Sequence, residues 1–417
     1  MTEIASIYWL RIIAKTKEEL EYKYQELLCK LVELDLDYAD LTPYQSKDNA
    51  KYCYSKFSHS FTDLKYKVEK NKPNVVQNKI INIAMLFTGQ GAQLPFMGYE
   101  LYQTQPIFKL EFDRCYKILK DINGSDLKKI IFNQDPAQLN DTGNTQPALF
   151  AYEYALAKLW QSWGIRPTWV IGHSVGEYPA ATIANYISLE TGIKLIQKRA
   201  QLMQSLPAGG GMAAVLGTAT NVQDYIQDYA ENVEIAALNA PKQTVVAGSL
   251  ATLDKLLEQL KIKRVKARKL VVSHAFHSKL MEPILAEFKS YVEQTNTNIP
   301  TAELISNVTG EFLQAKDLNS NYWTRHIREK VNFLGGLDSL AAAGANCFLE
   351  VGPQPFLLGM AAKTYDSSQD YHFISSRENN LNELLKMLNS AAELEQLGMN
   401  INWQNINIPE FSYTNNC

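Results

Sequence analysis

The chain has 417 residues, of which 46% are hydrophobic and 20% charged, and its formal net charge at pH 7 is −3. This length suggests two or three domains, and the small net charge argues against a nucleic-acid or membrane surface as the main partner. The five cysteines form no C-x-x-C pair, which indicates a reducing compartment and excludes a disulfide framework. Without an apolar run of transmembrane length or a signal peptide, we expect a cytoplasmic protein.

The first 75 residues differ in character from the rest. Their hydrophobic pattern predicts a strand at Ile7–Ala14 and an amphipathic helix at Glu18–Glu33. Tyr52–Phe57 and Lys65–Glu69 are predicted as further strands or a short helix. The segment is rich in Lys and Tyr but carries no recognisable chemistry, so we interpret residues 1–75 as a small α/β linker domain.

A buried strand is predicted at Ile81–Phe87, and it runs into the glycine-rich loop T-G-Q-G-A-Q at 88–93. Glycine-rich loops at the carboxyl ends of strands are where α/β sheets build sites, although a simple β-to-α turn is the alternative. The loop lacks the Lys and Ser/Thr of a Walker loop, which excludes that mode of nucleotide binding. Helices are predicted at Phe108–Asp121 and Gln146–Trp163.

The stretch W-V-I-G-H-S-V-G-E-Y at 169–178 contains a G-x-S-x-G pattern between an apolar strand and the predicted helix 179–184. The two glycines permit a sharp turn that exposes the hydroxyl of Ser174. The amide of the following residue, Val175, then lies at a helix start, where an anion is favoured. We interpret Ser174 as a nucleophile; the alternative is an ordinary turn of small residues.

The predicted helix Leu189–Leu206 carries Arg199 on its apolar stripe. A buried guanidinium is costly unless something neutralises its charge. One explanation is an internal salt bridge, for instance to Glu177 or Glu350. The other is a receptor for a substrate carboxylate, because the guanidinium fork binds two oxygens at once.

Residues 209–272 follow the order β-α-β-β-α-β, which is that of a ferredoxin-like unit. The predicted elements are strand 212–216, helix 222–229, strand 234–238, strand 243–248, helix 250–259 and strand 265–272. The last strand follows a basic run, which consists of Lys261, Lys263, Arg264, Lys266, Arg268 and Lys269. We favour a solvated edge strand over a docking face for an acidic partner. Aromatic residues do not interleave the charges, so nucleic acid is not expected.

The sequence S-H-A-F-H-S at 273–278 places two histidines three residues apart. No further His or Cys lies nearby to complete a metal shell, so no metal site is expected. A single general base that serves Ser174 explains the pair with fewer parts. The remaining predicted elements are strand 302–308, helix 321–327, strand 346–351 and a closing helix at 379–397.

Together these stretches resemble the malonyl-CoA:acyl carrier protein transacylase family, in the form of the acyltransferase domain of modular polyketide synthases. The matching motifs are F-T-G-Q-G-A-Q (87–93), T-Q-P-A-L-F-A (145–151), G-H-S-V-G-E-Y (172–178), K-R-A-Q-L-M-Q (198–204), N-A-P-K-Q-T-V-V-A-G (239–248), H-A-F-H-S (274–278), Y-W-T-R-H-I-R (322–328) and F-L-E-V-G-P (348–353). They occur in the family's order over about 80–380. Residues 1–75 resemble the linker between ketosynthase and acyltransferase, and G-M-N-I-N-W (398–403) resembles the linker after the acyltransferase.

The resemblance implies an α/β-hydrolase-like core with a parallel sheet, built from residues 76–208 and 273–380. Residues 209–272 would be the inserted ferredoxin-like subdomain, and 381–417 the post-acyltransferase linker. The start at Met1 and the unusual C-terminal sequence fit either a free-standing transferase or a piece of a longer synthase.

The resemblance also implies a ping-pong acyl transfer through a Ser-His dyad. Ser174 would be the nucleophile and His277 the base, oriented by a backbone carbonyl that belongs by position to His326. The family more often has Asn or Gln at that position. The amides of Gln90 and Val175 would form the oxyanion hole.

For substrate binding, the resemblance assigns Arg199 to the malonyl carboxylate and adds His274, Gln146 and Asn239 to the pocket. H-A-F-H, in which Phe276 stands beside the base, resembles malonyl-selective members. No bound cofactor or metal is implied. The implied substrates are malonyl-CoA and the phosphopantetheine arm of an acyl carrier protein, and the linker implies a ketosynthase neighbour in polyketide biosynthesis.

Two alternatives belong to other functional classes. An acyl-thioester hydrolase that clears carrier proteins would keep the serine and the base but make little use of Arg199. An inactive docking module of a synthase would need neither the nucleophile nor the base, and both are present in the sequence.

Overall fold

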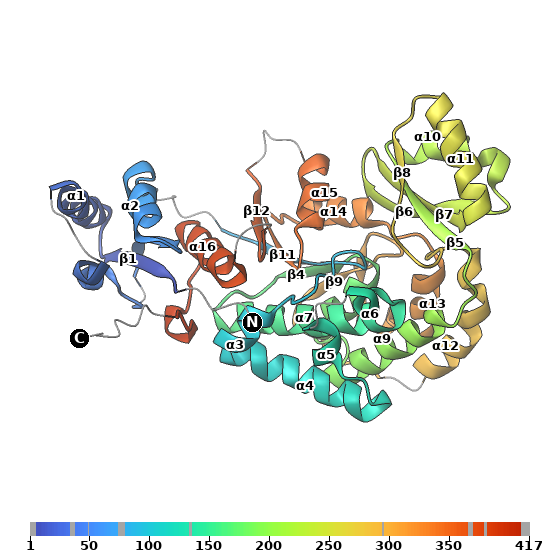
Figure 1. Cartoon of the computed structure of the whole chain (residues 1–417), viewed down its shortest axis with the longest axis horizontal. Coiled ribbons are helices and arrows are strands. Elements are labelled where there is room, and N and C mark those ends of the chain that lie inside the picture. Colours follow the sequence, from blue (N-terminus) through green and yellow to red (C-terminus); the bar gives the residue numbers. More distant parts are fainter. Residues whose placement is uncertain are drawn as a thin grey trace.

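The computed structural model describes residues 6–33, 38–48, 50–73, 80–132, 136–293, 296–365, 370–378 and 382–409. Figure 1 shows an elongated molecule with three parts along its long axis. The N-terminal unit lies at one end, the core with the large sheet in the middle, and an antiparallel subdomain at the other end.

The core is built on a six-stranded sheet with the order β10-β9-β4-β3-β11-β12. Its strands are β3 (Ile83–Phe87), β4 (Trp169–Gly172), β9 (Glu303–Ile305), β10 (Phe312–Leu313), β11 (Cys347–Val351) and β12 (His372–Ser375). All neighbours pair in parallel except β9 and β10. Every residue of β3, β4 and β11 is buried, as expected for parallel strands covered on both faces.

Helices surround this sheet, and the longest of them is the buried α7. The helices of the core are α3 (Tyr99–Thr104), α4 (Pro106–Asn123), α5 (Leu127–Ile131), α6 (Pro136–Asn140), α7 (Thr142–Ser162), α8 (Glu177–Ile183), α9 (Leu189–Gln204), α12 (Leu285–Val292), α13 (Ser320–Arg328), α14 (Phe333–Ala342) and α15 (Phe356–Thr364). Short 3-10 turns are η2 (Ser174–Gly176), η4 (Lys279–Ile284) and η5 (Ala315–Asp317). The α/β core predicted from the sequence is confirmed.

The register of β3 and β4 positions the site. Phe87 pairs with Gly172 at the carboxyl ends of the two strands. Because the strands are parallel, the loop after β3 and the turn after β4 leave the sheet side by side. The glycine-rich loop 88–93 and the serine turn, 85 residues apart in sequence, therefore meet at one edge of the sheet.

The antiparallel subdomain has the strand order β6-β7-β5-β8. Its elements are β5 (Gly210–Val215), α10 (Ala219–Ile226), η3 (Gln227–Tyr229), β6 (Val233–Ala240), β7 (Gln243–Ser249), α11 (Leu250–Ile262) and β8 (Ala267–Lys269). This is the ferredoxin-like arrangement that the sequence predicted. The last strand is shorter than the predicted 265–272. The subdomain has a hydrophobic cluster of its own, centred on Leu253, Leu256 and Leu260 of α11.

The N-terminal unit contains β1 (Tyr8–Ala14), α1 (Lys17–Glu33), η1 (Tyr38–Tyr44), β2 (Tyr52–Ser58) and α2 (Phe61–Lys70). Residues 65–69, predicted as strand or short helix, lie in the helix α2, which Ser60 caps by accepting a hydrogen bond from the backbone N–H of Asp63. The C-terminal elements α16 (Glu383–Gln396) and η6 (Trp403–Asn405) pack against this unit. In Figure 1, α16 lies between β1 and the core.

One buried ion pair ties the two ends of the described chain together. Arg11 on β1 donates to both carboxylate oxygens of Glu395 on α16, at 2.6 and 3.3 Å, and also to the carbonyl oxygens of Ser46 and Asp48. The indole N–H of Trp403 donates to the same carboxylate at 2.7 Å. The Arg11 side chain is fully buried. The pair therefore combines charge neutralisation with several hydrogen bonds.

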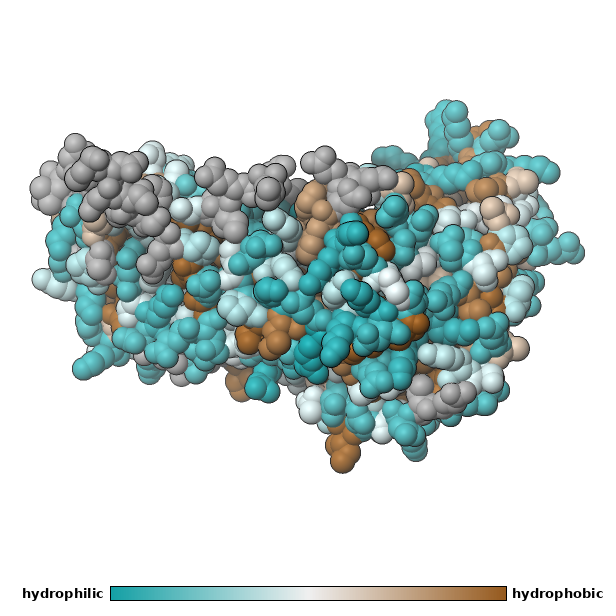
Figure 2. Space-filling view, turned by 60° about the horizontal axis from the view of Figure 1, so that its bottom comes forward, coloured by the Kyte–Doolittle hydropathy of each residue, from teal (hydrophilic) through white to brown (hydrophobic). Residues whose placement is uncertain are grey.

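The predicted domain boundaries at 75/76 and 380/381 fall within residues 74–79 and 379–381, which lie outside the described residues. The tail from 410, which includes Cys417, also lies outside them. These boundaries stay predictions. None of the helices in the described part of the chain combines the length and apolar character that a bilayer-spanning segment needs. On the face shown in Figure 2, hydrophobic side chains are interspersed among hydrophilic ones.

Replacing Glu395 by Ala leaves the buried guanidinium of Arg11 without its counter-charge. We expect the free energy of unfolding to fall by about 3–5 kcal/mol, as is typical when one partner of a buried pair is removed. Urea denaturation measures this loss. As a control, Glu19→Ala breaks the half-exposed pair with Lys23 and should cost much less, because solvent screens this pair. Equal losses in the two variants would contradict a structural role for the buried pair.

Candidate active site

The turn that carries Ser174 is held by close backbone packing. Ser174 adopts a left-handed conformation, with φ of 52°, directly after β4. A Cβ at Gly172 would overlap the backbone of Gly176 and Glu177, and a Cβ at Gly176 would overlap the carbonyl oxygen of Phe87. Only glycine fits at these two positions, so the G-x-S-x-G pattern is a geometric requirement of this turn.

Ser174 and His277 meet in the structure although they are 103 residues apart. The Ser174 hydroxyl lies 2.7 Å from the Nε2 atom of His277. His277 comes from the loop after β8, is 3% exposed, and also adopts a left-handed φ of 56°. Ser174 is half-buried, so its hydroxyl is in reach of solvent while the imidazole is shielded. This is the geometry of a nucleophile and its general base.

The main carbonyl partner of His277 is that of Glu329, and the predicted carbonyl of His326 makes only a secondary contribution. The Nδ1 atom of His277 lies 2.9 Å from the carbonyl oxygen of Glu329. Helix α13 ends at Arg328, and Glu329 is extended, with φ of −84° and ψ of 159°. Its carbonyl is thus the first one outside the helix and free to turn toward the imidazole. The backbone of His326 makes a smaller contribution to the His277 environment.

Arg199 reaches the nucleophile from α9 and is 2% exposed. Its NH2 group donates to the Ser174 hydroxyl at 3.1 Å, and its NH1 group donates to Oε1 of Gln146 at 2.6 Å. The guanidinium also lies over the ring of Tyr178, 5.7 Å from its centre. Its Nε–H has no acceptor among the described residues. The guanidinium therefore keeps a hydrogen-bond donor that no described residue accepts.

The internal salt bridge considered from the sequence is not formed, because both carboxylates are engaged elsewhere. Glu177 accepts the backbone N–H of Asn307 at 2.6 Å and a short hydrogen bond from the hydroxyl of Tyr322. Glu350 accepts the N–H groups at the start of α15, at 2.9 and 2.8 Å. Within the described chain, no carboxylate forms an ion pair with Arg199, so an anion from outside can bind to it.

The two amides expected to form an oxyanion hole are free. Neither Gln90 nor Val175 has an acceptor for its backbone N–H within the part of the chain that the structure describes. The loop of Gln90 is anchored by Glu153 of α7. This carboxyl group accepts the backbone N–H of Thr88 at 2.9 Å and a short hydrogen bond from the hydroxyl of Thr88. Two unpaired N–H groups beside a nucleophile suit a developing oxyanion.

The other predicted pocket residues lie around this centre with different partners. Gln146 bridges Arg199 and the sulfur of Met203, with its Nε2 3.3 Å from that sulfur. The Oδ1 atom of Asn239 accepts a hydrogen bond from Nε2 of His173 at 2.8 Å, which joins β6 of the ferredoxin-like subdomain to the turn. The structure thus brings Gln146 to the guanidinium, and Asn239 to the neighbour of the nucleophile.

His274 and Phe276 lie on the same loop as the base. His274 contacts the hydroxyl of Ser273 at 2.8 Å and the carbonyl oxygen of Leu206 at 3.1 Å. Phe276 is buried, with its ring 6.0 Å from that of His274. Both imidazole nitrogens of His274 are therefore occupied by protein partners, and Phe276 contributes volume beside the base.

Some residues that shape the site were missed from the sequence. Thr142 accepts from the Gln90 side chain at 3.2 Å and shares a hydrogen bond with Ser273 at 2.9 Å, which links the loop after β3 to the His274 loop. Asn307 binds the backbone of Ser174. Asn307 follows an apolar strand, and a polar residue at the carboxyl end of such a strand was an available signal.

Comparison with known proteins assigns the family. A model of the acyl transferase domain matches residues 84–400, which is more than half of the chain. The chain belongs to the acyl transferase domain family. The family resemblance indicated by the sequence motifs is confirmed.

Relatives and solved structures narrow the likeness. The phenolphthiocerol synthesis polyketide synthase Pks15/1 of Mycobacterium marinum is 36% identical over 322 residues, which is 77% of this chain and 15% of that protein. The acyltransferase domain from the second module of the salinomycin polyketide synthase superposes with a TM-score of 0.77 at 31% identity, covering 94% of both chains. A malonyl CoA-acyl carrier protein transacylase from Clostridium perfringens gives 0.68 at 30% identity, covering 76% of this chain and 99% of that one. The chain spans only 4% to 22% of the length of the curated relatives that it matches.

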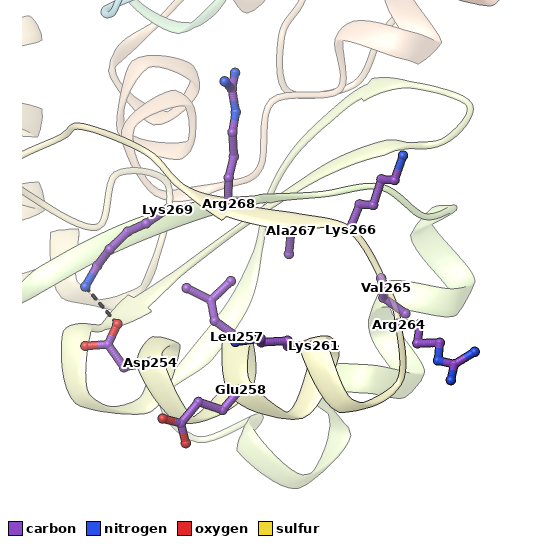
Figure 3. A pocket seen from close by; sticks show the side chains of 10 residues that line it. All are labelled: Asp254, Leu257, Glu258, Lys261, Arg264, Val265, Lys266, Ala267, Arg268 and Lys269. Atoms are coloured by element: carbon purple, nitrogen blue, oxygen red, sulfur yellow. Dashed lines mark hydrogen bonds and ion pairs between the residues drawn. The ribbon is translucent and has the colours of Figure 1, made fainter.

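The basic run of this acyltransferase extends from the end of α11 to the edge strand β8. The groove between α11 and β8 has a volume of about 700 Å³. Figure 3 shows Lys266 and Arg268 pointing away from α11, while Lys269 turns toward the helix and pairs with Asp254 at 2.8 Å. The charges are thus divided between two faces of β8, as in a solvated edge strand.

The two histidines of the 273–278 loop have separate surroundings. Within the described part of the acyltransferase, no three His, Cys, Asp or Glu side chains come together in a way that holds a metal ion. His274 and His277 point to separate protein partners, as described above. The four described cysteines are all free thiols.

The charge of Arg199 affects the candidate base. Burial lowers the pKa of His277 to about 3, and the nearby guanidinium of Arg199 contributes to the same shift. The imidazole of the empty acyltransferase is therefore neutral throughout the neutral and mildly acidic range, with Nε2 available to accept the proton of Ser174.

The reaction of Ser174 with a fluorophosphonate should accordingly show little dependence on pH between 8 and 5, because the neutral imidazole persists well below the ordinary histidine pKa of about 6.5. The labelling rate, followed by intact mass, measures this. Arg199→Gln removes one cause of the shift, so its acid limb should appear at a higher pH than that of the unaltered chain. A fall in the labelling rate centred near pH 6.5 in the unaltered chain would contradict the lowered pKa of His277. Ser174→Ala measures the background labelling.

Proposed function

We propose that this chain transfers a malonyl unit from CoA to the phosphopantetheine thiol of an acyl carrier protein, in polyketide biosynthesis. The observation that carries the proposal is the buried guanidinium of Arg199, which lies 3.1 Å from the Ser174 hydroxyl and has no carboxylate partner among the described residues. A dicarboxylic acyl group supplies the missing charge and places its thioester carbon next to the nucleophile.

In the first half-reaction, the Ser174 oxygen attacks the thioester carbonyl carbon while Nε2 of His277 accepts the hydroxyl proton. The negative charge that develops on the carbonyl oxygen is stabilised by the N–H groups of Gln90 and Val175. Loss of a single donor of this kind typically costs about 3 kcal/mol of barrier. The carbon–sulfur bond then breaks, the protonated imidazole gives its proton to the sulfur, and CoA leaves a malonyl ester on Ser174.

The second half-reaction runs the same steps in reverse order with a new thiol. The phosphopantetheine thiol passes its proton to His277 and attacks the ester carbonyl carbon. The carbon–oxygen bond to Ser174 breaks, and the serine oxygen recovers its proton. The carbonyl of Glu329 at 2.9 Å keeps the imidazole in the same orientation for both halves. The reaction needs no bound cofactor, because activation comes from the thioester itself.

Selection of the malonyl unit rests on charge and on volume. The unused Nε–H and the NH2 group of Arg199 offer two donors for the free carboxylate of the substrate. The buried ring of Phe276 beside the base leaves little room for an α-methyl group. A single methyl group distinguishes substrates by only about 1–3 kcal/mol, so we expect a preference for malonyl over methylmalonyl and some leakage.

The partners follow from the proposed reaction. The second substrate is an acyl carrier protein, and the N-terminal unit would contact a ketosynthase, as the linker resemblance implies. Polyketide synthases among the relatives support this placement. The likeness to a malonyl CoA-acyl carrier protein transacylase supports the choice of acyl donor.

Incubation with malonyl-CoA should add one malonyl group to the chain, and this adduct should be absent in Ser174→Ala. Intact mass spectrometry measures it, and Ser188→Ala, which removes a helix-capping serine from the same region, should load normally. Free malonate without an adduct would instead favour the thioester hydrolase. Absence of both products would favour the inactive docking module.

Arg199→Ala should lose malonyl loading by roughly 100-fold or more while acetyl loading is retained or gained, since only the malonyl group carries a carboxylate for the guanidinium. Competition between the two acyl-CoA substrates, followed by mass, measures the ratio. Lys198→Ala is the matched control: it removes the neighbouring cation on α9, which pairs with Glu287 on the surface at 2.5 Å. Equal malonyl loading in Arg199→Ala and Lys198→Ala would refute the proposed clamp.

A further inference from the structure

Asn307 lies beside the serine turn because of the register between two parallel strands. Ile171 of β4 pairs with Ile305 of β9. Two residues further along each strand, the chain therefore places Asn307 next to His173, the residue before the nucleophile. Asn307 is 2% exposed. A buried carboxamide at this place must find hydrogen-bond partners in the protein.

Those partners are the two backbone groups that flank His173. The Oδ1 atom of Asn307 accepts the backbone N–H of Ser174 at 2.6 Å, and its Nδ2 group donates a short hydrogen bond to the carbonyl oxygen of Gly172. One side chain thus bridges a carbonyl and the N–H two residues later. We call this arrangement the Asn307 clamp.

The turn depends on such a clamp for a physical reason. The left-handed region is unfavourable for a non-glycine residue because its Cβ crowds the backbone, and Ser174 adopts it. A buried N–H without an acceptor would add a desolvation penalty. The neighbouring turn residues use backbone acceptors: the N–H of His173 donates to Phe87, and that of Gly176 donates to His173. For the N–H of Ser174 the acceptor is the Asn307 side chain.

Asn307 is itself fixed on both sides of its own backbone. Its N–H donates to Oε2 of Glu177 at 2.6 Å, and its carbonyl oxygen accepts the N–H of Asn332 at 2.7 Å. Glu177 begins α8, three residues after Ser174, and is held by the hydroxyl of Tyr322. The clamp therefore connects the turn to the helix that follows it through a buried carboxyl group.

We propose that Asn307 is a positioning residue for the reaction of Ser174: it holds the serine backbone in the left-handed conformation that sets the hydroxyl 2.7 Å from His277. It also occupies the N–H of Ser174, so that only the amides of Gln90 and Val175 face the developing oxyanion. The turnover part of this inference rests on the proposed acyl transfer, but the reactivity of the serine does not.

The chain contains a matched control for this clamp at the opposite edge of the sheet. Asn346 accepts the backbone N–H of Asn82 at 2.9 Å and donates to the carbonyl oxygen of Ile80 at 2.9 Å. It bridges the same two kinds of backbone groups, also two residues apart, but at the amino end of β3. Asn346→Ala thus removes hydrogen bonds of the same kind, in a more exposed setting, at the other end of β3 from the serine turn.

The test compares Asn307→Ala with Asn346→Ala. For Asn307→Ala we expect fluorophosphonate labelling of Ser174 and kcat for malonyl transfer to fall by about 100-fold, since a small misplacement of a reacting group can cost this much. The KM for malonyl-CoA should stay within about threefold, because Arg199 is not touched. Asn346→Ala should lower the thermal midpoint but leave the labelling rate within about twofold.

Asn307→Asp provides a readout that general destabilisation does not produce. Protonated Asp has the shape and the donor of Asn, whereas ionised Asp repels the carbonyl of Gly172. Labelling in this variant should be slow at pH 8 and recover toward pH 5, while the unaltered chain stays flat. Equal labelling rates for Asn307→Ala and the unaltered chain, equal losses in the two alanine variants, or a pH-independent Asn307→Asp would each overturn the proposal. Slow labelling of Asn307→Ala alongside an unaltered chain that forms no malonyl ester would refute the acyl transfer and leave the clamp standing.

Discussion

The site depends on backbone packed directly against backbone at the carboxyl edge of the sheet. A Cβ at Gly176 would overlap the carbonyl of Phe87, and a Cβ at Gly89 would lie 2.8 Å from the carbonyl oxygen of His173. Gly352, from the loop after β11, lies against the side chain of Thr88. The loop after β3 and the turn after β4 thus meet backbone to backbone, and the loop after β11 packs on a side chain of the first. These contacts hold the loop that carries Gln90 against the turn that carries Val175.

Three buried carboxyl groups bind the backbone around this edge of the sheet. Glu153 and Glu177 accept backbone N–H groups from loops that leave the sheet at this edge, and Glu350 accepts N–H groups from the first turn of α15. Burial raises the pKa of Glu177 and of Glu350 to about 8, and it raises that of Glu153 well above its usual value. At neutral pH these groups therefore carry little negative charge. The guanidinium of Arg199 remains the dominant charge beside the nucleophile, which suits a site that receives a carboxylate with its substrate.

Local patterns made most of the fold and the centre of the site predictable, whereas contacts set by register did not. The turn at Ser174, the proposed base His277 and the buried Arg199 each stand in a short motif that the sequence displays. The sequence placed the carbonyl that orients His277 at His326, whereas the structure has its main partner at Glu329. Which carbonyl faces the imidazole depends on where α13 ends, and helix ends are poorly marked in sequence. Asn307 was missed because the β4–β9 register, which no local pattern encodes, brings it across 133 residues to the serine.

The contact between Arg11 and Glu395 has a consequence for how such chains can be recombined. Since α16 packs on β2, the segments before and after the core form one structural unit, which we call the platform. In sequence, the core is inserted between the two halves of the platform. A chimera joined within that platform would combine an arginine from one parent with a non-matching partner from the other. Crossover points between the platform and the core would take both residues of the ion pair from the same parent. The segment that can be exchanged between such chains is therefore the core without the platform.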